Sequence, residues 1–326
     1  MGEVSIDAEG QALLDLAAVA LLGSEPEFTK LDVCELAGID EERADSLWRA
    51  MGFPDVPDDE IAFTQRDVDA VRGALDLLRT DVVDDEVVRA QTRVMSQALA
   101  TIAAAHLEIA EPEERDVDRI HDFVQEVLPA LDDLLVYLYR RHLHAAVERT
   151  LLRDRADESG PLPSLAVGFA DLVGFTRVAD HLEEGELTRL VEHFSEAAAD
   201  VVAEGAGRVV KMIGDEVMYT VAEPAKAVEI ALRLVEEVGD HDGLPPLRAG
   251  VACGPVVLRH GDVYGSPANL AHRLVDVARP GTVVVDEHVA TAVEPRDDLE
   301  AVRITGIRRV RGFDKLHVFA LRRRSP

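Results

Sequence analysis

Two short runs in the C-terminal half each place one carboxylate beside a glycine at the end of an apolar stretch. The first run ends in Asp171, three residues before Gly174, and the second contains Gly214-Asp215. A strand end and a tight hairpin turn can bring Asp171 and Asp215 together. Hard divalent cations such as Mg²⁺ commonly bind through one or two carboxylates plus substrate phosphates. The two runs therefore predict a two-metal site that acts on a phosphoryl group.

The turn after the first carboxylate indicates the same chemistry. Gly174 leads through Phe175 and Thr176 into a helical pattern. Backbone N–H groups at such a turn can bind a polyphosphate. Phe175 and Thr176 are therefore candidate substrate-binding residues, and the pattern favours nucleotide chemistry.

A third segment, from Asp262 to Arg273, adds polar side chains at a helical spacing. Asn269 and Arg273 lie four residues apart and so share one face of a helix expected over residues 269–278. Together the three segments resemble the catalytic domain of class III nucleotidyl cyclases over roughly residues 163–322. The match is specific because separate positions agree, namely Asp171, Lys211, Asp215, Asp262, Asn269 and Arg273.

The resemblance implies a role for each of these positions. Asp171 and Asp215 fall on the metal-binding aspartates, which hold two Mg²⁺ or Mn²⁺ ions per site. Asn269 and Arg273 fall on the catalytic pair that handles the ribose and the transition-state phosphate. The implied reaction converts ATP to 3′,5′-cyclic AMP and pyrophosphate.

Lys211 and Asp262 fall on the pair that reads the base in this family. Lys211 can donate to a ring nitrogen of adenine and Asp262 can accept from its exocyclic amine, whereas guanine presents the opposite pattern. A polar mismatch in a binding site discriminates strongly because it leaves groups unpaired. The sequence favours ATP, and a guanylyl cyclase is the weaker option.

Three features depart from the family's pattern. His272 stands where many relatives have a small residue, and we expect it to face away from the site. Pro267 precedes Asn269, a place that the first turn of a helix tolerates. The triphosphate-binding lysine of some relatives falls within residues 309–313, which contain no lysine, and Arg311 is its expected substitute.

Family geometry also implies the oligomeric state. The metal aspartates of one subunit meet the base-reading, asparagine and arginine residues of the other. Because this chain carries both sets, the resemblance implies a symmetric homodimer with two sites. The alternative is a non-catalytic sensor or transcription regulator that keeps a cyclase-like domain for dimerisation. Such relatives usually lose a metal aspartate or the arginine, and this chain retains them.

The organisation of the chain fits two domains within 326 residues. We expect a helical regulatory domain over residues 1–152, a polar linker over 153–163 and the catalytic domain over 164–326. The predicted fold class is α+β, with a ferredoxin-like βαββαβ core after an all-α domain. Its expected strands cover residues 164–171, 207–222 as a hairpin, 247–253, 282–285 and 315–321, and its expected helices cover 184–203, 224–238 and 269–278.

Composition narrows the class of protein. No stretch of 18 apolar residues occurs, and Cys34 and Cys253 lie far apart, so we expect a cytoplasmic, disulfide-free protein without membrane insertion. The net charge of −29 is concentrated in residues 1–160, which hold 37 acidic and 15 basic residues. Such a surface repels nucleic acid, which is therefore not an expected partner.

The N-terminal half reads as helical and offers two regulatory features. Residues 28–38, 48–53 and 63–68 resemble a MerR-type helix-turn-helix, but the candidate helix 41–50 is acidic, which favours a structural or subunit-contact role. The layout also resembles soluble actinobacterial adenylate cyclases whose N-terminal domain restrains the catalytic dimer, some of them responding to pH. His142 and His144, near the end of the helical pattern 119–152, are candidate pH sensors or ordinary surface residues. A small apolar ligand in the helical domain is another option.

Overall fold

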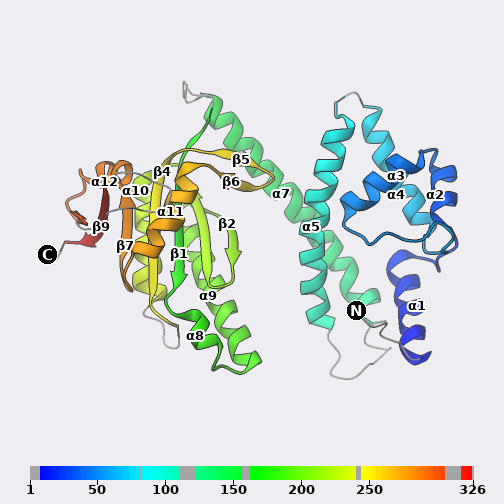
Figure 1. The fold of residues 1–326 in the computed structure, drawn as a ribbon, viewed down its shortest axis with the longest axis horizontal. Coiled ribbons are helices and arrows are strands. Elements are labelled where there is room, and N and C mark those ends of the chain that lie inside the picture. The colour runs from blue at the N-terminus through cyan, green and yellow to red at the C-terminus, as the bar shows by residue number, and fades with distance from the viewer. Residues whose placement is uncertain are drawn as a thin grey trace. The chain divides into compact units, whose positions relative to one another are not determined.

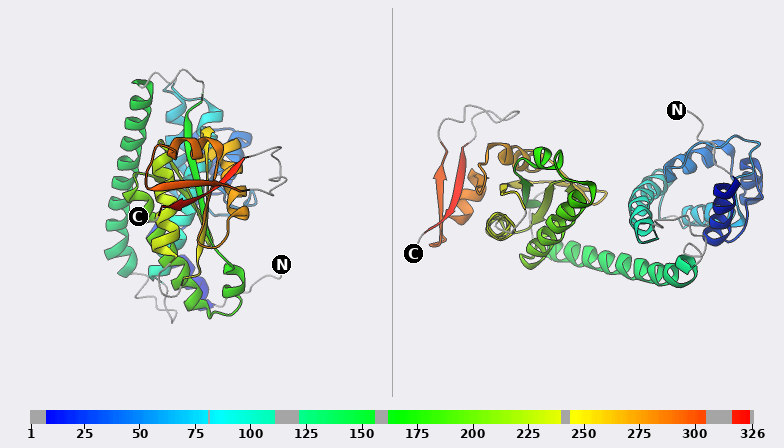
Figure 2. Two further views of the ribbon diagram at one scale, coloured as in Figure 1. Left: turned by 90° about the vertical axis from the view of Figure 1, so that its left-hand side faces the viewer. Right: turned by 90° about the horizontal axis from the view of Figure 1, so that it is seen from below.

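The computed structural model describes residues 8–80, 82–110, 122–155, 162–239, 244–304 and 317–324. Its contacts divide the chain into two units, residues 1–155 and 156–326, each with its own apolar core. The first unit is helical and the second is a sheet with helices on both faces (Figures 1 and 2). This confirms the predicted α+β class. Among the described residues, no helix is long and apolar enough to cross a membrane.

The N-terminal unit is built from helices of very different length. In chain order these are α1 (Ala8–Leu22), α2 (Lys30–Ala37), α3 (Glu41–Met51), α4 (Gln65–Leu78), α5 (Asp85–Ala110), the π-helical turn η1 (Phe123–Val127) and α7 (Leu128–Arg155). Because α7 continues through Arg155, residues 153–155 of the predicted linker are helical. Residues 156–161 lie outside the described residues, so the linker stays a prediction.

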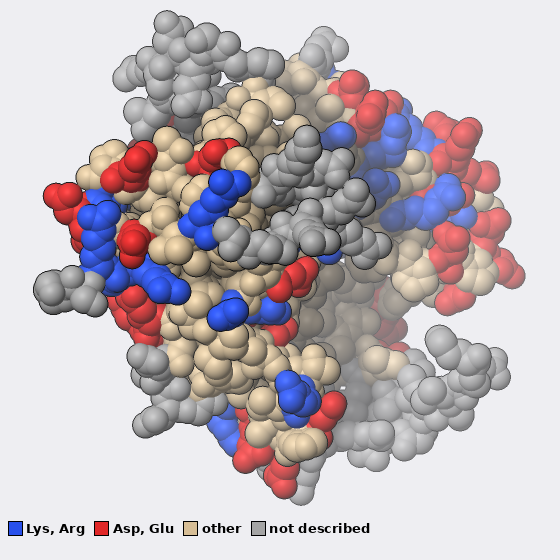
Figure 3. Space-filling view, turned by 60° about the vertical axis from the view of Figure 1, so that its left-hand side comes forward, with Lys and Arg blue, Asp and Glu red and all other residues tan. Residues whose placement is uncertain are grey.

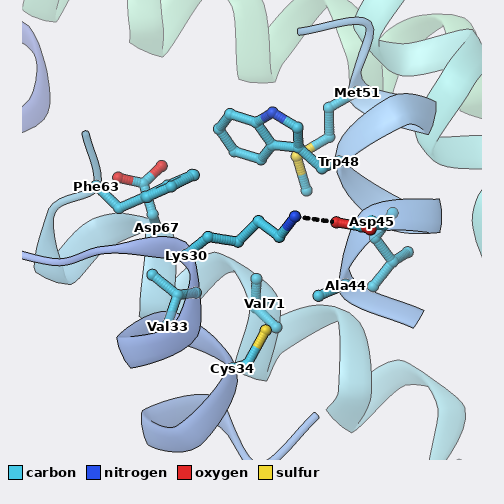
Figure 4. A pocket seen from close by; sticks show the side chains of 11 residues that line it. Lys30, Val33, Cys34, Ala44, Asp45, Trp48, Met51, Phe63, Asp67 and Val71 are labelled. Atoms are coloured by element: carbon cyan, nitrogen blue, oxygen red, sulfur yellow. Dashed lines mark ion pairs between the residues drawn. The ribbon is translucent and has the colours of Figure 1, made fainter. Parts of the chain in front are cut away.

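The segment that resembles a helix-turn-helix forms two capped helices. Gly38 ends α2 in the left-handed conformation, with φ of 71°, and Asp40 begins α3 by accepting a hydrogen bond from the backbone N of Arg43 at 2.9 Å. Lys30 of α2 points into the unit, where its ammonium lies 2.8 Å from Asp45 and 2.9 Å from Asp58 (Figure 4). The cavity beside Lys30 measures about 30 Å³, which is room for a water molecule but not for an apolar ligand.

The C-terminal unit holds the mixed sheet. Its elements are β1 (Ser164–Leu172), α8 (Phe175–Ala179), α9 (Glu184–Glu204), β2 (Arg208–Ile213), β3 (Glu216–Val221), α10 (Pro224–Arg233), η2 (Leu234–Val238), β4 (Leu247–Pro255), β5 (Val257–Arg259), β6 (Asp262–Tyr264), α11 (Ser266–Val277), β7 (Val283–Asp286), α12 (Glu287–Val293), β8 (Leu299–Arg303) and β9 (Val318–Arg323). Strands β1 to β4 with α9 and α10 give the predicted βαββαβ order. The sheet order is β2-β3-β1-β4-β7-β9-β8.

The sheet carries a separate apolar cluster on each face because its strands alternate. Tyr219 belongs to the cluster under α9 and α10, where its buried hydroxyl donates to the carbonyl of Ala227 at 2.7 Å. Phe169 belongs to the cluster under α11. On that face, a Cβ at Gly250 would lie 2.4 Å from the carbonyl oxygen of Ala271, so glycine lets α11 approach β4 closely. This contact fixes α11 over the strands that carry the predicted site.

Candidate active site

The first pair of candidate residues, Asp171 and Asp215, meets at one edge of the sheet. Asp171 is the second-last residue of β1, where it pairs in register with Glu216 of β3 and Arg248 of β4. Asp215 lies in the tight turn between β2 and β3, and its carbonyl oxygen accepts from the N–H of Leu172 at 3.1 Å. That hydrogen bond ties the hairpin turn to the end of β1, so the two carboxylates lie close together.

The charges at this edge are predominantly negative. Burial raises the pKa of Asp215, and the charge of Asp171 raises it further. Burial together with the charges of Asp171 and Asp215 raises the pKa of Glu216 to about 7. Arg248 offsets part of this charge, because its Nε lies 2.7 Å from Oδ1 of Asp171 and its Nη2 lies 2.9 Å from Oδ2.

The donor set at this edge fits a hard divalent cation that shares its coordination with a substrate. Asp171 and Asp215 supply oxygen ligands in a site where Arg248 balances only part of the negative charge. Within the described part of the chain, no group of three or more His, Cys, Asp or Glu side chains could hold a metal ion by itself. Two carboxylates suit Mg²⁺ or Mn²⁺, which complete their shells with water and phosphate oxygens.

Lys211 and Asp262 form an ion pair between two separate sheets. Lys211 lies on β2 and Asp262 begins the short strand β6, and Nζ lies 2.7 Å from Oδ2. Burial opposes ionisation of Asp262, but hydrogen bonds from Lys211 and from the N–H of Val263 outweigh it, so its pKa lies below the usual value. Side-chain exposures of 41% for Lys211 and 25% for Asp262 leave the pair accessible to a ligand.

Asn269 and Arg273 both lie on α11, which begins at Ser266 and includes Pro267 in its first turn. Asn269 is exposed. The side chain of Arg273 is 38% exposed, and its guanidinium lies 3.8 Å from Asp276, which is a loose ion pair. Both side chains are therefore accessible to a ligand.

The expectation that His272 faces away from the site is wrong. Its Nε2 lies 3.7 Å from a carboxylate oxygen of Glu216, and its ring meets Phe169 edge-on at a centroid distance of 5.4 Å. Position 272 follows Ala271, which faces Gly250 of β4, so its side chain turns toward β1 and β3. His272 therefore belongs to the surroundings of Asp215.

The other candidates have simpler environments. Phe175 packs against the core at the start of α8, and Thr176 beside it is exposed. Arg311 lies outside the described residues. His142 and His144 lie on α7 of the N-terminal unit, where both are exposed and His144 Nδ1 is 3.4 Å from Glu148.

Arg248 and Glu216 are the two residues near the site that the sequence did not single out. Each is directly opposite Asp171 in the sheet. Glu216 could have been noted from its place next to Asp215. Arg248 could have been found only by aligning the predicted strands 164–171 and 247–253 in the correct register.

Comparison with known proteins agrees with this geometry. A sequence model described as the adenylate and guanylate cyclase catalytic domain matches residues 158–323. An adenylate cyclase of Glutamicibacter nicotianae is 35% identical in an alignment that covers 92% of this chain and 80% of that protein. The chain belongs to the class III adenylate and guanylate cyclase family.

This class III cyclase has further relatives among actinobacteria. An adenylate cyclase of Streptomyces coelicolor is 39% identical over 82% of this chain and 71% of its own length. A pH-sensitive adenylate cyclase of Mycobacterium tuberculosis is 32% identical over 94% of this chain and 81% of its own length. Among solved structures, the guanylate cyclase domain of RhGC from Catenaria anguillulae superposes on 50% of this chain and 98% of its own, with a TM-score of 0.46 and 17% identity.

Proposed function

We propose that the protein is an adenylate cyclase that converts ATP to 3′,5′-cyclic AMP and pyrophosphate by two-metal catalysis at a homodimer interface. The observation that carries the proposal is that one domain holds two separate polar sets. These are the acidic edge with Asp171 and Asp215, and the ion pair of Lys211 and Asp262. The first set suits a metal-bound triphosphate, and the second suits a base. Family membership and the adenylate cyclases among its relatives support the same reaction.

The ion pair supports ATP as the substrate. Lys211 has hydrogens to donate and Asp262 has carboxylate oxygens to accept, as the ring nitrogen and amino group of adenine require. Guanine bound in the same orientation would place its ring N–H opposite the Lys211 donor and its carbonyl oxygen opposite the Asp262 acceptor, so that neither protein group would have a suitable partner. A binding site of this kind discriminates against the wrong base because the bound base would shield these polar groups from water and leave them unpaired.

The remaining residues act on the ribose and phosphates. Asn269, exposed on α11, would hold the ribose so that its 3′-hydroxyl faces the α-phosphate. Arg273 is only loosely paired with Asp276 and would turn toward the α-phosphate to stabilise charge as the bond to pyrophosphate breaks. Mg²⁺ or Mn²⁺ held by Asp171 and Asp215 would supply positive charge for the triphosphate and for the attacking hydroxyl. Thr176, and Arg311 by its sequence position, are further candidates for phosphate contact.

Exposed apolar side chains support the homodimer. Around the Lys211–Asp262 pair, Ile213 of β2, Val257 and Leu258 of β5, and Tyr264 of β6 are 42–51% exposed. In the N-terminal unit, α7 exposes Leu134, Val136, Tyr137, Leu138, Tyr139, Leu143, Val147 and Leu151. Clusters of exposed apolar side chains on a folded domain are typical of protein interfaces.

We also propose that the N-terminal unit regulates the catalytic unit, with His142 and His144 as its candidate pH-responsive residues. A pH-sensitive adenylate cyclase among the relatives supports this idea. Nucleic acid is not a proposed partner. The basic side chains Lys30 and Arg43 of the helix-turn-helix-like segment are paired with aspartates. On the face in Figure 3, described basic and acidic side chains are interspersed, without a continuous basic area.

The test is product formation from ATP and from GTP, with Mg²⁺ and with Mn²⁺, by the full-length chain. We expect cyclic AMP from ATP and little cyclic GMP. Asp171→Asn and Asp215→Asn should each lower kcat at least about 1000-fold, because each removes a charged ligand of the metal site. Asp200→Asn, the same change at an exposed position of α9, should leave kcat unchanged.

Four outcomes would contradict parts of the proposal. No product under any of these conditions would favour the non-catalytic sensor instead. Cyclic GMP as the main product would overturn the role of Lys211 and Asp262. An unchanged pH profile after replacing His142 and His144 by Gln would contradict their role as pH-responsive residues. Equal activity of residues 161–326 and the full chain would contradict regulation by the N-terminal unit.

A further inference from the structure

Arg248 forms a bidentate ion pair with the carboxylate of Asp171, a geometry that surface ion pairs seldom have. Its guanidinium presents Nε to Oδ1 at 2.7 Å and Nη2 to Oδ2 at 2.9 Å, so both oxygens of Asp171 are bound at once. The two residues face each other across β1 and β4, and their side chains are only 26% and 17% exposed. A bidentate pair of this kind fixes orientation as well as charge.

Arg248 makes the shortest ion pair at an edge that carries several negative charges. The charges of Asp171, Asp215 and Asp276 raise the pKa of Glu216, the charge of Asp171 also raises the pKa of Asp215, and Arg248 lowers both. Within the described part of the chain, the other basic contacts of these groups are looser, with His272 3.7 Å from Glu216 and Arg273 3.8 Å from Asp276. The pair therefore supplies the positive charge next to Asp171 before any cation arrives.

We propose that Arg248 is a positioning residue and internal counter-ion of Asp171, which holds the carboxylate for catalysis and competes with the divalent cation for it. This inference rests on the proposed function, because it assigns the metal to Asp171. A carboxylate has about four acceptor positions, and the arginine fork uses one on each oxygen. The remaining positions can bind a cation, but that cation must enter beside a fixed positive charge.

The competition has a predictable sign. A neighbouring charge typically changes the affinity of a carboxylate for a proton by about 10- to 1000-fold, and a divalent cation feels that charge twice over. Loss of the two hydrogen bonds also lets the Asp171 side chain move, so that metal binding must order it. The free energy of ordering one side chain is much smaller than the gain in metal affinity from removing the positive charge. A neutral residue at position 248 should therefore bind the metal more tightly and catalyse more slowly.

The experiment measures binding of Mn²⁺ alone to the full-length protein, by the electron paramagnetic resonance signal of free Mn²⁺, without nucleotide. Arg248→Gln should bind Mn²⁺ at least about tenfold more tightly than the unchanged protein. Arg248→Lys, which keeps the charge but loses the fork, should bind within about threefold of it. Both variants should show a lower kcat at saturating Mn²⁺, because Asp171 is no longer held by two hydrogen bonds.

Arg233→Gln is the matched control. Its guanidinium also makes a bidentate pair, with Glu237, and its side chain is 24% exposed, but it lies on α10 away from the acidic edge. It should leave Mn²⁺ affinity and kcat unchanged. If Arg248→Gln does not fold, as judged by circular dichroism, Arg248→Met provides a second neutral side chain of similar length.

The outcomes separate this inference from the proposed function. Unchanged or weaker Mn²⁺ binding by both neutral variants, with Asp171→Asn abolishing it, would overturn the role of Arg248 alone. Mn²⁺ binding that survives Asp171→Asn would overturn the proposed metal site and this inference with it. No Mn²⁺ binding by any of the variants would overturn this inference alone, because the proposed metal site shares its coordination with a substrate. Tighter binding with an undiminished kcat would reject the positioning role but leave the competition.

Discussion

Gly250 is the position where one methyl group tests how the sheet positions α11. A Cβ there would lie 2.4 Å from the carbonyl oxygen of Ala271, 2.7 Å from the backbone N of Val275 and 2.9 Å from Cβ of Leu274. None of these atoms lies at the end of a flexible side chain, so no change of rotamer relieves the contacts. Because Cβ contacts under 3.0 Å essentially do not occur, Gly250→Ala should move α11 away from β4 by about 0.6 Å.

The size of the effect follows from that displacement. Overpacking of a core by a methyl group typically costs about 1–3 kcal/mol, and a clash with backbone belongs near the upper end. For a domain of this size, such a loss lowers the midpoint of thermal unfolding by about 4–12 °C. Since Asn269 and Arg273 lie on α11, we also expect kcat to fall by about 10- to 100-fold, as a misplacement of this order commonly causes.

The assay compares scanning calorimetry with cyclic AMP formation measured well below the unfolding midpoint. Gly185→Ala on α9 is the control, because its Cβ would approach nothing more closely than a side-chain nitrogen of Arg189 at 3.8 Å. That change should be neutral or should stabilise the helix by up to about 1 kcal/mol. A Gly250→Ala protein that keeps both its unfolding midpoint and its kcat would refute the reasoning that close packing fixes α11.

Two further predictions concern charge. In metal-free buffer the raised pKa of Glu216, about 7, makes its stabilising contribution complete below the unfolded value near 4.5 and lost as the pH rises through 7. Glu216→Gln should abolish that loss, so the free energy of unfolding of the variant should rise relative to that of the unchanged protein by on the order of 1 kcal/mol between pH 5 and pH 8, after allowance for solvent screening. A difference in this free energy that falls over the same range would contradict the assignment. Lys211→Met should raise the KM for ATP by about 10- to 100-fold and weaken selection against GTP. Lys226→Met, which removes an exposed ion pair on α10, should change neither the KM nor the selection. Equal effects of the two substitutions would argue against base reading by Lys211.

Regular elements with strong patterns could be predicted from the sequence, whereas short or exposed ones could not. The strand at 164–171 is an apolar run that is buried along most of its length, and the structure extends it by one residue as β1. In contrast, β5 and β6 have three residues each, too few to show alternation. Strand β8 buries Leu299 and exposes its other residues, so its pattern resembles a loop.

The site shows a similar division. Asp171 and Asp215 could be found because their chemistry is tied to local signals, a strand end and a glycine turn. Arg248 carries no such signal, since an arginine in a strand ordinarily points to solvent. Its role follows from register, which places it directly opposite Asp171. The prediction for His272 is wrong for a related reason. Helix periodicity shows which residues share a face with His272, but the direction of that face follows only from the packing of α11 against β4.

Register also explains why the acidic edge is costly before a ligand binds. Pairing of β1 with β3 places Glu216 beside Asp171, and the hairpin turn adds Asp215, so three carboxyl groups share a partly buried site with one bidentate arginine. The raised pKa values of Asp215 and Glu216 are the measure of that cost. A ligand that binds only the folded state offsets this cost, and the stability that it adds grows with the logarithm of its concentration. The features that make this edge suited to a divalent cation are therefore the same features that weaken the metal-free fold, and Arg248 limits that weakness by remaining on Asp171 until a cation competes for it.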